Sequence, residues 1–260
     1  ENRLTHSAIF NADDELSFSI FRSLECDCSY SFSRTKGKGD FVGEVLSSSI
    51  SGISLDVHSK FGLCQIRSKL VGDYTVSNLL AAAAVLLSMG YAPTLVGDVL
   101  SSVPSVPGRL EQVASSPRVF VDYAHTPDAL SRAIAAVRGL MASGRLIVVF
   151  GCGGNRDRGK RPIMGDVVFS NADVSVVTSD NPRHEDPDAI ISDILNNKVA
   201  SENLVIEADR RKAIHKAISI AHPTDVVLIA GKGHEDYQEI LGVKHHFSDK
   251  EVVQELCAEY

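Results

Sequence analysis

Five short runs of valine, isoleucine and leucine recur between residues 118 and 231, and each run is followed by a segment with helical spacing. The runs cover 118–123, 145–150, 174–179, 203–208 and 225–231, and the helical segments cover 128–141, 162–171, 187–197, 210–221 and 248–260. Strands that are apolar throughout are buried on both faces, as in a parallel sheet covered by helices. The alternation therefore predicts an α/β fold on a right-handed, doubly wound parallel sheet, which places ligands at the carboxyl ends of its strands.

The first part of the chain has a different pattern. Short β-rich stretches at 7–14, 29–33, 52–59 and 63–72 precede an alanine-rich helical segment at 76–91 and a second one at 94–103. Two prolines and a glycine in the stretch 102–112 are typical of a linker. We therefore expect two domains, 1–106 and 107–260.

Composition excludes several classes of protein. No apolar run approaches the roughly 20 residues of a membrane span, and a net charge of −7 argues against a nucleic-acid partner. No secretory signal precedes the first residue, so we expect a cytoplasmic protein, and a start at Glu1 suggests a piece of a longer chain. The cysteines have no zinc-site spacing, which favours small buried thiols over a metal site. They are Cys26, Cys28, Cys64, Cys152 and Cys257.

Four loops follow strands of the expected sheet. In the first, Asp122 and His125 are three residues apart and could orient a phosphate-bound metal or water. The alternative is a helix cap by Thr126 or Asp128 beside a turn histidine.

The second loop, 151–161, is here called the arginine loop. It lacks the third glycine of a dinucleotide-binding motif, where Arg156 stands, and Arg161 replaces the hydroxyl residue of a phosphate-binding Walker loop. Since guanidinium groups bind carboxylates and phosphates as a fork, an anion clamp explains this loop better.

The third loop, 180–187, is called the DNPR loop after its first four residues, and the fourth, 231–235, is called the glycine loop. Pro182 stiffens a turn that presents Asn181 and Arg183 together, and the glycines of the fourth loop allow a ligand to approach the backbone. Each loop alone could be a turn with solvated charges, but four at one sheet edge indicate a binding site.

The order and spacing of five motifs resemble those of the MurE ligases. The motifs are PGRLEQV, VFVDYAHTPDAL, FGCGGNRDRGKRPIMG, TSDNPRHEDP and AGKGHEDYQ, and upstream FNADDE and GDYTVSNLLAAAAVL resemble the later part of the central ATPase domain. The resemblance implies a Rossmann-like C-terminal domain and an ATP-dependent amide ligation in peptidoglycan precursor synthesis, which cell shape and cell division require. ATP would phosphorylate the D-glutamyl carboxylate of UDP-N-acetylmuramoyl-L-alanyl-D-glutamate, and the amino group of meso-diaminopimelate would attack the acyl phosphate.

The resemblance also implies roles for individual residues. Arg183 would bind the carboxylate that distinguishes meso-diaminopimelate from lysine, Arg156 would bind a second carboxylate, and Gly231 and Glu235 would hold the remaining amino-acid groups. The residues of the recognition motif are Asp180, Asn181, Pro182 and Arg183.

Around the nucleotide, the resemblance places Arg109, Asp122 and His125 near the phosphates and Asn78 at the adenine. Thr75 stands where the family commonly has asparagine. The phosphate-binding loop, the modified lysine that holds Mg²⁺ and the UDP-binding domain would lie upstream of Glu1. We therefore expect these 260 residues alone to be inactive, and the parent enzyme to be a monomer that acts on small molecules without nucleic acid or membrane.

Two alternative functions fit these residues less well. A MurE-like structural subunit of a plastid RNA polymerase assembly would not need Arg156, Arg183 and Glu235, although Thr75 favours it slightly. A nicotinamide-dependent dehydrogenase is excluded by the missing glycine and the arginine loop.

Overall fold

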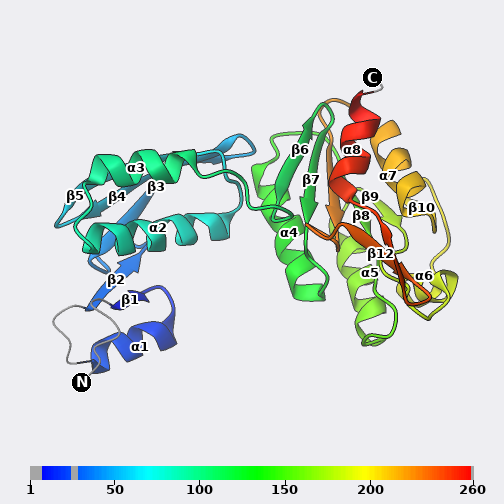
Figure 1. Cartoon of the computed structure of the whole chain (residues 1–260), viewed down its shortest axis with the longest axis horizontal. Coiled ribbons are helices and arrows are strands. Elements are labelled where there is room, and N and C mark those ends of the chain that lie inside the picture. The colour runs from blue at the N-terminus through cyan, green and yellow to red at the C-terminus, as the bar shows by residue number, and fades with distance from the viewer. Residues whose placement is uncertain (1–7, 25–28, 259–260) are drawn as a thin grey trace. The chain divides into compact units, whose positions relative to one another are not determined.

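The computed structural model describes residues 8–24 and 29–258, and the chain divides into two compact units, Glu1–Pro104 and Ser105–Tyr260 (Figure 1). The first unit contains a five-stranded sheet in the order β1-β2-β3-β4-β5. Its strands are β1 (Ala8–Asn11), β2 (Ser29–Ser33), β3 (Phe41–Ser49), β4 (Gly52–Ser59) and β5 (Gly62–Ser68). The first three strands are parallel, and β3, β4 and β5 form an antiparallel meander.

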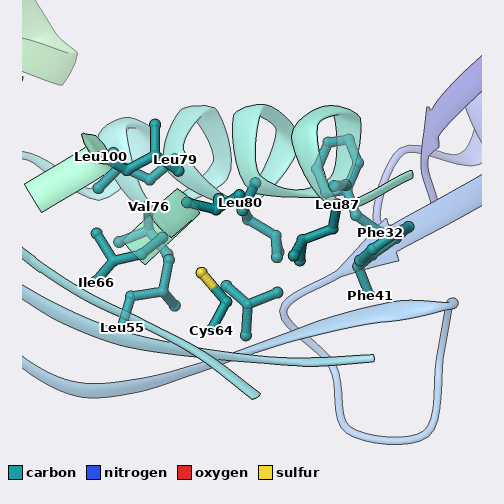
Figure 2. Packing of buried hydrophobic residues seen from close by; sticks show 14 of the residues in the cluster. Phe32, Phe41, Leu55, Cys64, Ile66, Val76, Leu79, Leu80, Leu87 and Leu100 are labelled. Carbon is teal, nitrogen blue, oxygen red and sulfur yellow. The ribbon is translucent and has the colours of Figure 1, made fainter. Parts of the chain in front are cut away.

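The core of the first unit lies between this sheet and α2 (Asp73–Ser88), with α3 (Pro93–Ser102) packed beside β5. Figure 2 shows Leu80 and Leu87 of α2 directed toward the sheet, where Phe41 and Cys64 are fully buried. A side chain at Gly43 would meet Leu80 at 2.9 Å, so the glycine lets the helix approach the strand closely. The expected β-rich stretches and both helices are present in the described residues. The sequence reading missed β3 and the short helix α1 (Glu15–Ser23).

The second unit is built on a six-stranded sheet in the order β10-β9-β8-β11-β7-β6. Its strands are β6 (Glu111–Ser115), β7 (Arg118–Asp122), β8 (Leu146–Phe150), β9 (Val174–Val177), β10 (Leu204–Ile206) and β11 (Val226–Ala230). The five strands from β7 to β11 are parallel, which confirms the predicted doubly wound sheet. The linker prediction was wrong at its end, because Glu111 and Gln112 pair with β7 in the antiparallel edge strand β6.

Helices cover both faces of this sheet. Alternate strand residues such as Val119, Ile147 and Ile229 pack against α7 (Arg210–Ser219) and α8 (Asp249–Ala258). On the opposite face α4 (Pro127–Leu140), α5 (Lys160–Asn171) and α6 (Pro187–Leu195) lie in sequence order, each in contact with the next. A two-stranded hairpin, β12 (Tyr237–Ile240) and β13 (Val243–His246), follows β11. Across the described residues, every helix is too short or too polar to cross a bilayer.

Candidate functional site

The carboxyl ends of β7, β8, β9 and β11 lie at one edge of the second sheet and carry the four loops that the sequence singled out. Because β11 lies between β7 and β8, the last of these loops enters the middle of the edge. The amide of Gly231 donates to the carbonyl oxygen of Asp122 at 3.0 Å across the first and fourth loops. The structure therefore brings the loops together as parallel-sheet topology predicts.

The arginine loop and the DNPR loop are joined by hydrogen bonds. The amide of Gly154 donates to the carbonyl oxygen of Asn181 at 2.9 Å, and Nη1 of Arg183 donates to the carbonyl oxygen of Gly154 at the same distance. The side-chain oxygen of Asn155 accepts from the amide of His184 at 3.0 Å. These bonds hold the two loops in fixed register.

Arg183 is fixed by both its backbone and its side chain. Its φ of 53° lies in the left-handed region, which non-glycine residues rarely adopt. Its amide donates to the carbonyl oxygen of Glu239, and its own carbonyl oxygen accepts from the amide of Leu241 at 2.6 Å. The backbone of Arg183 is therefore hydrogen-bonded to β12 and to the residue that follows it. Its Nε lies 3.3 Å from Oε2 of Glu239. Nη1 thus makes a hydrogen bond and Nε an ion pair, and Nη2 donates no hydrogen bond to the described residues.

Gly153 opens space beside this guanidinium. A side chain at Gly153 would meet Nη1 of Arg183 at 2.8 Å and Cγ of Arg156 at 3.7 Å. Arg156 is exposed and forms no ion pair with the described residues. The two arginines expected to bind carboxylates therefore lie on either side of one glycine.

The other arginines of this loop stabilise the fold. Arg161 is fully buried and pairs with Glu185 at 2.9 Å and with Asp193 at 2.8 Å, while Arg158 pairs with Glu185 at 2.8 Å. Hydrogen bonds from Arg161 and from the amide of Asn155 lower the pKa of Glu185 to about 2. Among the arginines of the expected anion clamp, only Arg156 has no ion pair with the described residues, because Glu185 and Asp193 pair with Arg158 and Arg161.

Asp180 and Gly231 face one another across the edge. Oδ1 of Asp180 accepts from the amide of Asn181 at 2.8 Å, whereas Oδ2 is buried without a hydrogen-bond partner in the described structure. Gly231 has a φ of 122°, and a side chain there would meet Oδ2 of Asp180 at 2.6 Å. Only glycine therefore fits at this position, and it leaves a buried acceptor for a ligand or water.

Glu235 is held from the DNPR loop. Its Oε2 accepts from Nδ2 of Asn181 at 2.9 Å and lies 3.8 Å from Nζ of Lys232. The side chain of Glu235 remains partly exposed while that of Lys232 is fully buried. An anionic group is therefore presented to solvent at the edge of the sheet, beside Asn181.

Asp122 is engaged within the protein. Its two carboxylate oxygens each accept at 2.8 Å, from the amides of Leu110 and Ala124. Burial raises the pKa of Asp122, against the opposing effect of these bonds and of the positive charge of Arg109. The carboxylate thus positions the segments that carry Arg109 and His125.

Arg109, Tyr123, His125 and His234 form a cluster at the ends of β7 and β11. The guanidinium of Arg109 lies 5.0 Å above the Tyr123 ring, and the rings of His125 and His234 lie 4.7 and 5.4 Å from that ring. The Nζ of Lys160 donates to the carbonyl oxygen of His125 at 2.8 Å, and this bond places a further positive charge beside the cluster. The positive charges of Arg109 and Lys160 make this cluster suitable for an anion.

Asn78 belongs to the first unit, where it is exposed on α2. Thr75 is buried, and its hydroxyl donates to the carbonyl oxygen of Val71 at 2.7 Å. The Thr75 hydroxyl is therefore bonded to the backbone just before α2. Cys64 and Cys152 are buried, as expected of small thiols, and Cys26 and Cys28 lie outside the described residues.

Each of the two units matches a known protein family. The Mur ligase middle domain matches residues 2–86, and the Mur ligase glutamate ligase domain matches residues 108–233. The chain belongs to the Mur ligase family. This Mur ligase is 43% identical over 251 residues to UDP-N-acetylmuramoyl-L-alanyl-D-glutamate–2,6-diaminopimelate ligase of Chromobacterium violaceum, covering 95% of the chain and 51% of the relative. It is 44% identical over 248 residues to the ligase of the same name in Nostoc, covering 94% and 50%.

Solved structures show the same relationship. A structure of a UDP-N-acetylmuramoyl-L-alanyl-D-glutamate–2,6-diaminopimelate ligase matches this Mur ligase with a TM-score of 0.74 and 34% identity, over 97% of the chain and 53% of that structure. The ADP complex of Mycobacterium tuberculosis folylpolyglutamate synthase shares the fold, with a TM-score of 0.61 and 21% identity over 78% of the chain and 46% of the synthase. The chain spans about half the length of the curated relatives it matches.

Several residues that face the site were not assigned from the sequence. Glu239 lies on a hairpin that the strand and helix patterns did not reveal, and Glu185 was read as part of a turn. Lys232 belongs to the glycine loop, where the sequence alone is also compatible with a solvated side chain. Its burial follows from the position of β11 in the middle of the sheet, which no local pattern encodes.

Proposed function

We propose that this Mur ligase chain supplies the amino-acid-binding half of an ATP-dependent ligase that joins meso-diaminopimelate to UDP-N-acetylmuramoyl-L-alanyl-D-glutamate. Residues 107–260 form the domain that binds the amino acid, and residues 1–106 form the remainder of the ATP-binding domain. The observation that carries the proposal is the fixed, partly exposed guanidinium of Arg183, in which Nη1 contacts Gly154 and Nε contacts Glu239, while Nη2 donates no hydrogen bond to the described residues.

The site accounts for selection of an amino acid with a second carboxylate. A carboxylate bound by Arg183 gains charge-assisted hydrogen bonds, each contributing about 1.5–3 kcal/mol. Lysine has a hydrogen atom where meso-diaminopimelate has its second carboxylate, so these hydrogen bonds to Arg183 would not be made. A preference on the order of 100-fold for meso-diaminopimelate follows from one to two such bonds.

The remaining groups have partners of suitable charge. Arg156 is placed to bind a second carboxylate, and Glu235, held by Asn181, is placed to pair with the ammonium group that does not react. The reacting amine attacks the acyl phosphate, the new C–N bond forms, and inorganic phosphate leaves. The four residues of the recognition motif therefore act mainly by orientation and electrostatics.

The nucleotide end of the site is assigned to the cationic and aromatic cluster. The resemblance to the family assigns Arg109, Asp122 and His125 to the phosphates, and it assigns Asn78, which lies on α2, to the adenine. Mg²⁺ would accompany ATP and supply charge neutralisation at the phosphates. The described residues contain no group of three or more His, Cys, Asp or Glu side chains that could hold a metal ion. We place the enzyme in the cytoplasm as a monomer, as its resemblance to the family implies.

The test is an assay of the complete polypeptide that the gene encodes, with ATP, the UDP-linked dipeptide and either meso-diaminopimelate or L-lysine. Product with diaminopimelate and almost none with lysine is expected. Efficient product with lysine would keep the ligase but overturn the role of Arg183. Absence of product with both amino acids would overturn the proposed function.

A further inference from the structure

Lys232 carries a fully buried ammonium group directly beneath the amino-acid site. A buried charge is costly unless it is paired and hydrogen-bonded. Its Nζ donates to Oδ1 of Asn181 at 2.8 Å and to the carbonyl oxygen of Tyr237 at 2.6 Å. Burial lowers the pKa of Lys232, and the charges of Asp180 and Glu235 act in the opposite direction. This ammonium group therefore faces inward, toward residues of the site, and is not available to a ligand.

The position of the ammonium group decides how the Asn181 amide is oriented. Oδ1 of Asn181 accepts from Lys232 and, at 3.0 Å, from the amide of Glu239. If the amide were reversed, its NH₂ group would face two donors, which is unfavourable. With Oδ1 fixed, Nδ2 of Asn181 must point to Oε2 of Glu235, as the 2.9 Å distance confirms.

We propose that Lys232 is a positioning residue for the incoming amino acid, which orients the Asn181 amide and, through it, the Glu235 carboxylate. The inference rests on the proposed function for the identity of the amino acid. The geometry itself depends only on the contacts among Lys232, Asn181 and Glu235. The bond to the carbonyl oxygen of Tyr237 extends the same control to the start of β12, the strand that also holds Arg183.

The kinetic test compares Lys232→Met with Lys216→Met in the complete gene product. Methionine keeps the length of the side chain and removes the charge, and Lys216 is an exposed lysine on α7. Loss of a charge-assisted hydrogen bond should raise the KM for meso-diaminopimelate by about 10-fold to 100-fold. The KM for ATP should stay within about twofold, and Lys216→Met should match the wild type. Equal rises in both KM values, or no rise for the amino acid, would overturn the proposal.

A double-mutant cycle tests whether Lys232 acts through Asn181. In an Asn181→Ala background, Lys232→Met should change the KM for meso-diaminopimelate by less than about twofold, because the amide that it orients is gone. If the KM increases of the two single variants multiply in the double variant, Lys232 acts independently of Asn181. That result would overturn the mechanism. If Lys232→Met does not fold, Lys232→Gln replaces it, since it retains one donor for Oδ1. The KM of Lys232→Gln should then lie between the KM values of the wild type and Asn181→Ala. A KM equal to that of the wild type would show that the positive charge of Lys232 is not needed to orient Asn181, and would overturn that part of the proposal.

A measurement without substrate separates this inference from the proposed function. In ¹⁵N-labelled chain, the side-chain NH₂ of Asn181 should exchange slowly with solvent in the wild type and in Lys216→Met. It should exchange at least about tenfold faster in Lys232→Met, because the amide is no longer held. Suppose that the Asn181 NH₂ exchanges faster in Lys232→Met, but the wild-type protein does not ligate diaminopimelate. The positioning role of Lys232 would then stand, and the proposed ligase function would be rejected. Unchanged exchange would reject the positioning role whatever the activity.

Discussion

The guanidinium of Arg210 and the carboxylate of Asp249 form a two-point ion pair, with distances of 2.7 and 2.8 Å, from which solvent is completely excluded. The same guanidinium donates to the carbonyl oxygens of Ser179 at 3.3 Å and Ala230 at 3.1 Å. These two carbonyls immediately precede the DNPR loop and the glycine loop. The ion pair therefore joins α8 to the base of both loops.

Removal of one partner of this pair should destabilise the protein strongly, because the other charge is left buried and unpaired. We expect Arg210→Met to cost about 3–5 kcal/mol of unfolding free energy, measured by urea denaturation. The double variant Arg210→Met/Asp249→Leu should recover much of that loss. Arg211→Met, which removes an exposed pair with Glu255, should cost less than about 1 kcal/mol. A loss of equal size for Arg210 and Arg211 would contradict the role of burial.

Replacement of Arg183 by lysine should not preserve selectivity. Lysine retains the charge but cannot bind the carbonyl of Gly154, Glu239 and a ligand carboxylate with one planar group. In the complete enzyme, kcat/KM for meso-diaminopimelate should fall by about 100-fold, while the KM for the UDP-linked dipeptide changes little. Arg132→Lys, at an exposed helical position, is the matched control. Near wild-type efficiency would show that Arg183 acts through charge alone.

Gly154 should tolerate no side chain. A Cβ at this position would collide with the carbonyl oxygen of Pro182, so the arginine loop and the DNPR loop would have to separate. We expect Gly154→Ala to lower both the melting temperature and the affinity for meso-diaminopimelate, with about a tenfold effect on affinity if the contacts of Arg183 are loosened. Gly139→Ala, at a helical position with open space around it, should leave both quantities unchanged or slightly raised. A Gly154 variant with wild-type affinity would show that the close contact is dispensable.

Glu185 should make stability depend on pH in the acid range. Its pKa falls from the ordinary 4.5 to about 2 in the folded protein, so folding favours the ionised form. The stabilisation is fully present above pH 4.5 and is lost as the pH falls from there toward 2. Urea midpoints of the wild type and Glu185→Gln should therefore differ most near pH 6 and converge below pH 3. A constant difference would show that ionisation of Glu185 is not involved.

Cys152 should be inert toward alkylating agents. Burial raises the pKa of its thiol to about 12, and its Sγ lies 3.6 Å from the sulfur of Met164. At pH 8 almost no thiolate is present, and thiolate is the reactive species. Iodoacetamide should label the half-buried Cys257 before Cys152, as measured by peptide mass spectrometry, and urea should abolish the difference. Rapid native labelling of Cys152 would indicate that the end of β8 opens.

The local pattern was sufficient to predict the parallel sheet and its helices. Apolar runs such as 146–150 can only be buried on both faces, and the intervening helices fix the parallel direction. The edge strand β6 was missed because Pro104, Pro107 and Gly108 precede it and are typical of a loop. The hairpin that carries Glu239 was missed because its two strands are largely polar and exposed, without the alternation that marks a buried strand.

The positions of the four loops at one sheet edge were predictable, whereas the contacts of their side chains were not. Any strand end of a parallel sheet can carry a ligand-binding loop, so the DNPR and glycine loops could be identified from the sequence. The neutralisation of Arg158 and Arg161 by Glu185 depends on contacts between residues more than 20 positions apart, which sequence spacing does not reveal. The same holds for Lys232 and Asn181, which are 51 positions apart.

The strand order has a consequence for synthesis of the chain on the ribosome. β11 is the last parallel strand to emerge, yet it lies between β7 and β8, which have no direct pairing with each other. Until residues 226–230 have left the exit tunnel, the sheet consists of separate pieces, and Asp122 has no neighbouring Gly231. The sheet edge that carries the four loops is therefore complete only after β11 has emerged, so shorter nascent polypeptides lack the hydrogen bond between Gly231 and Asp122.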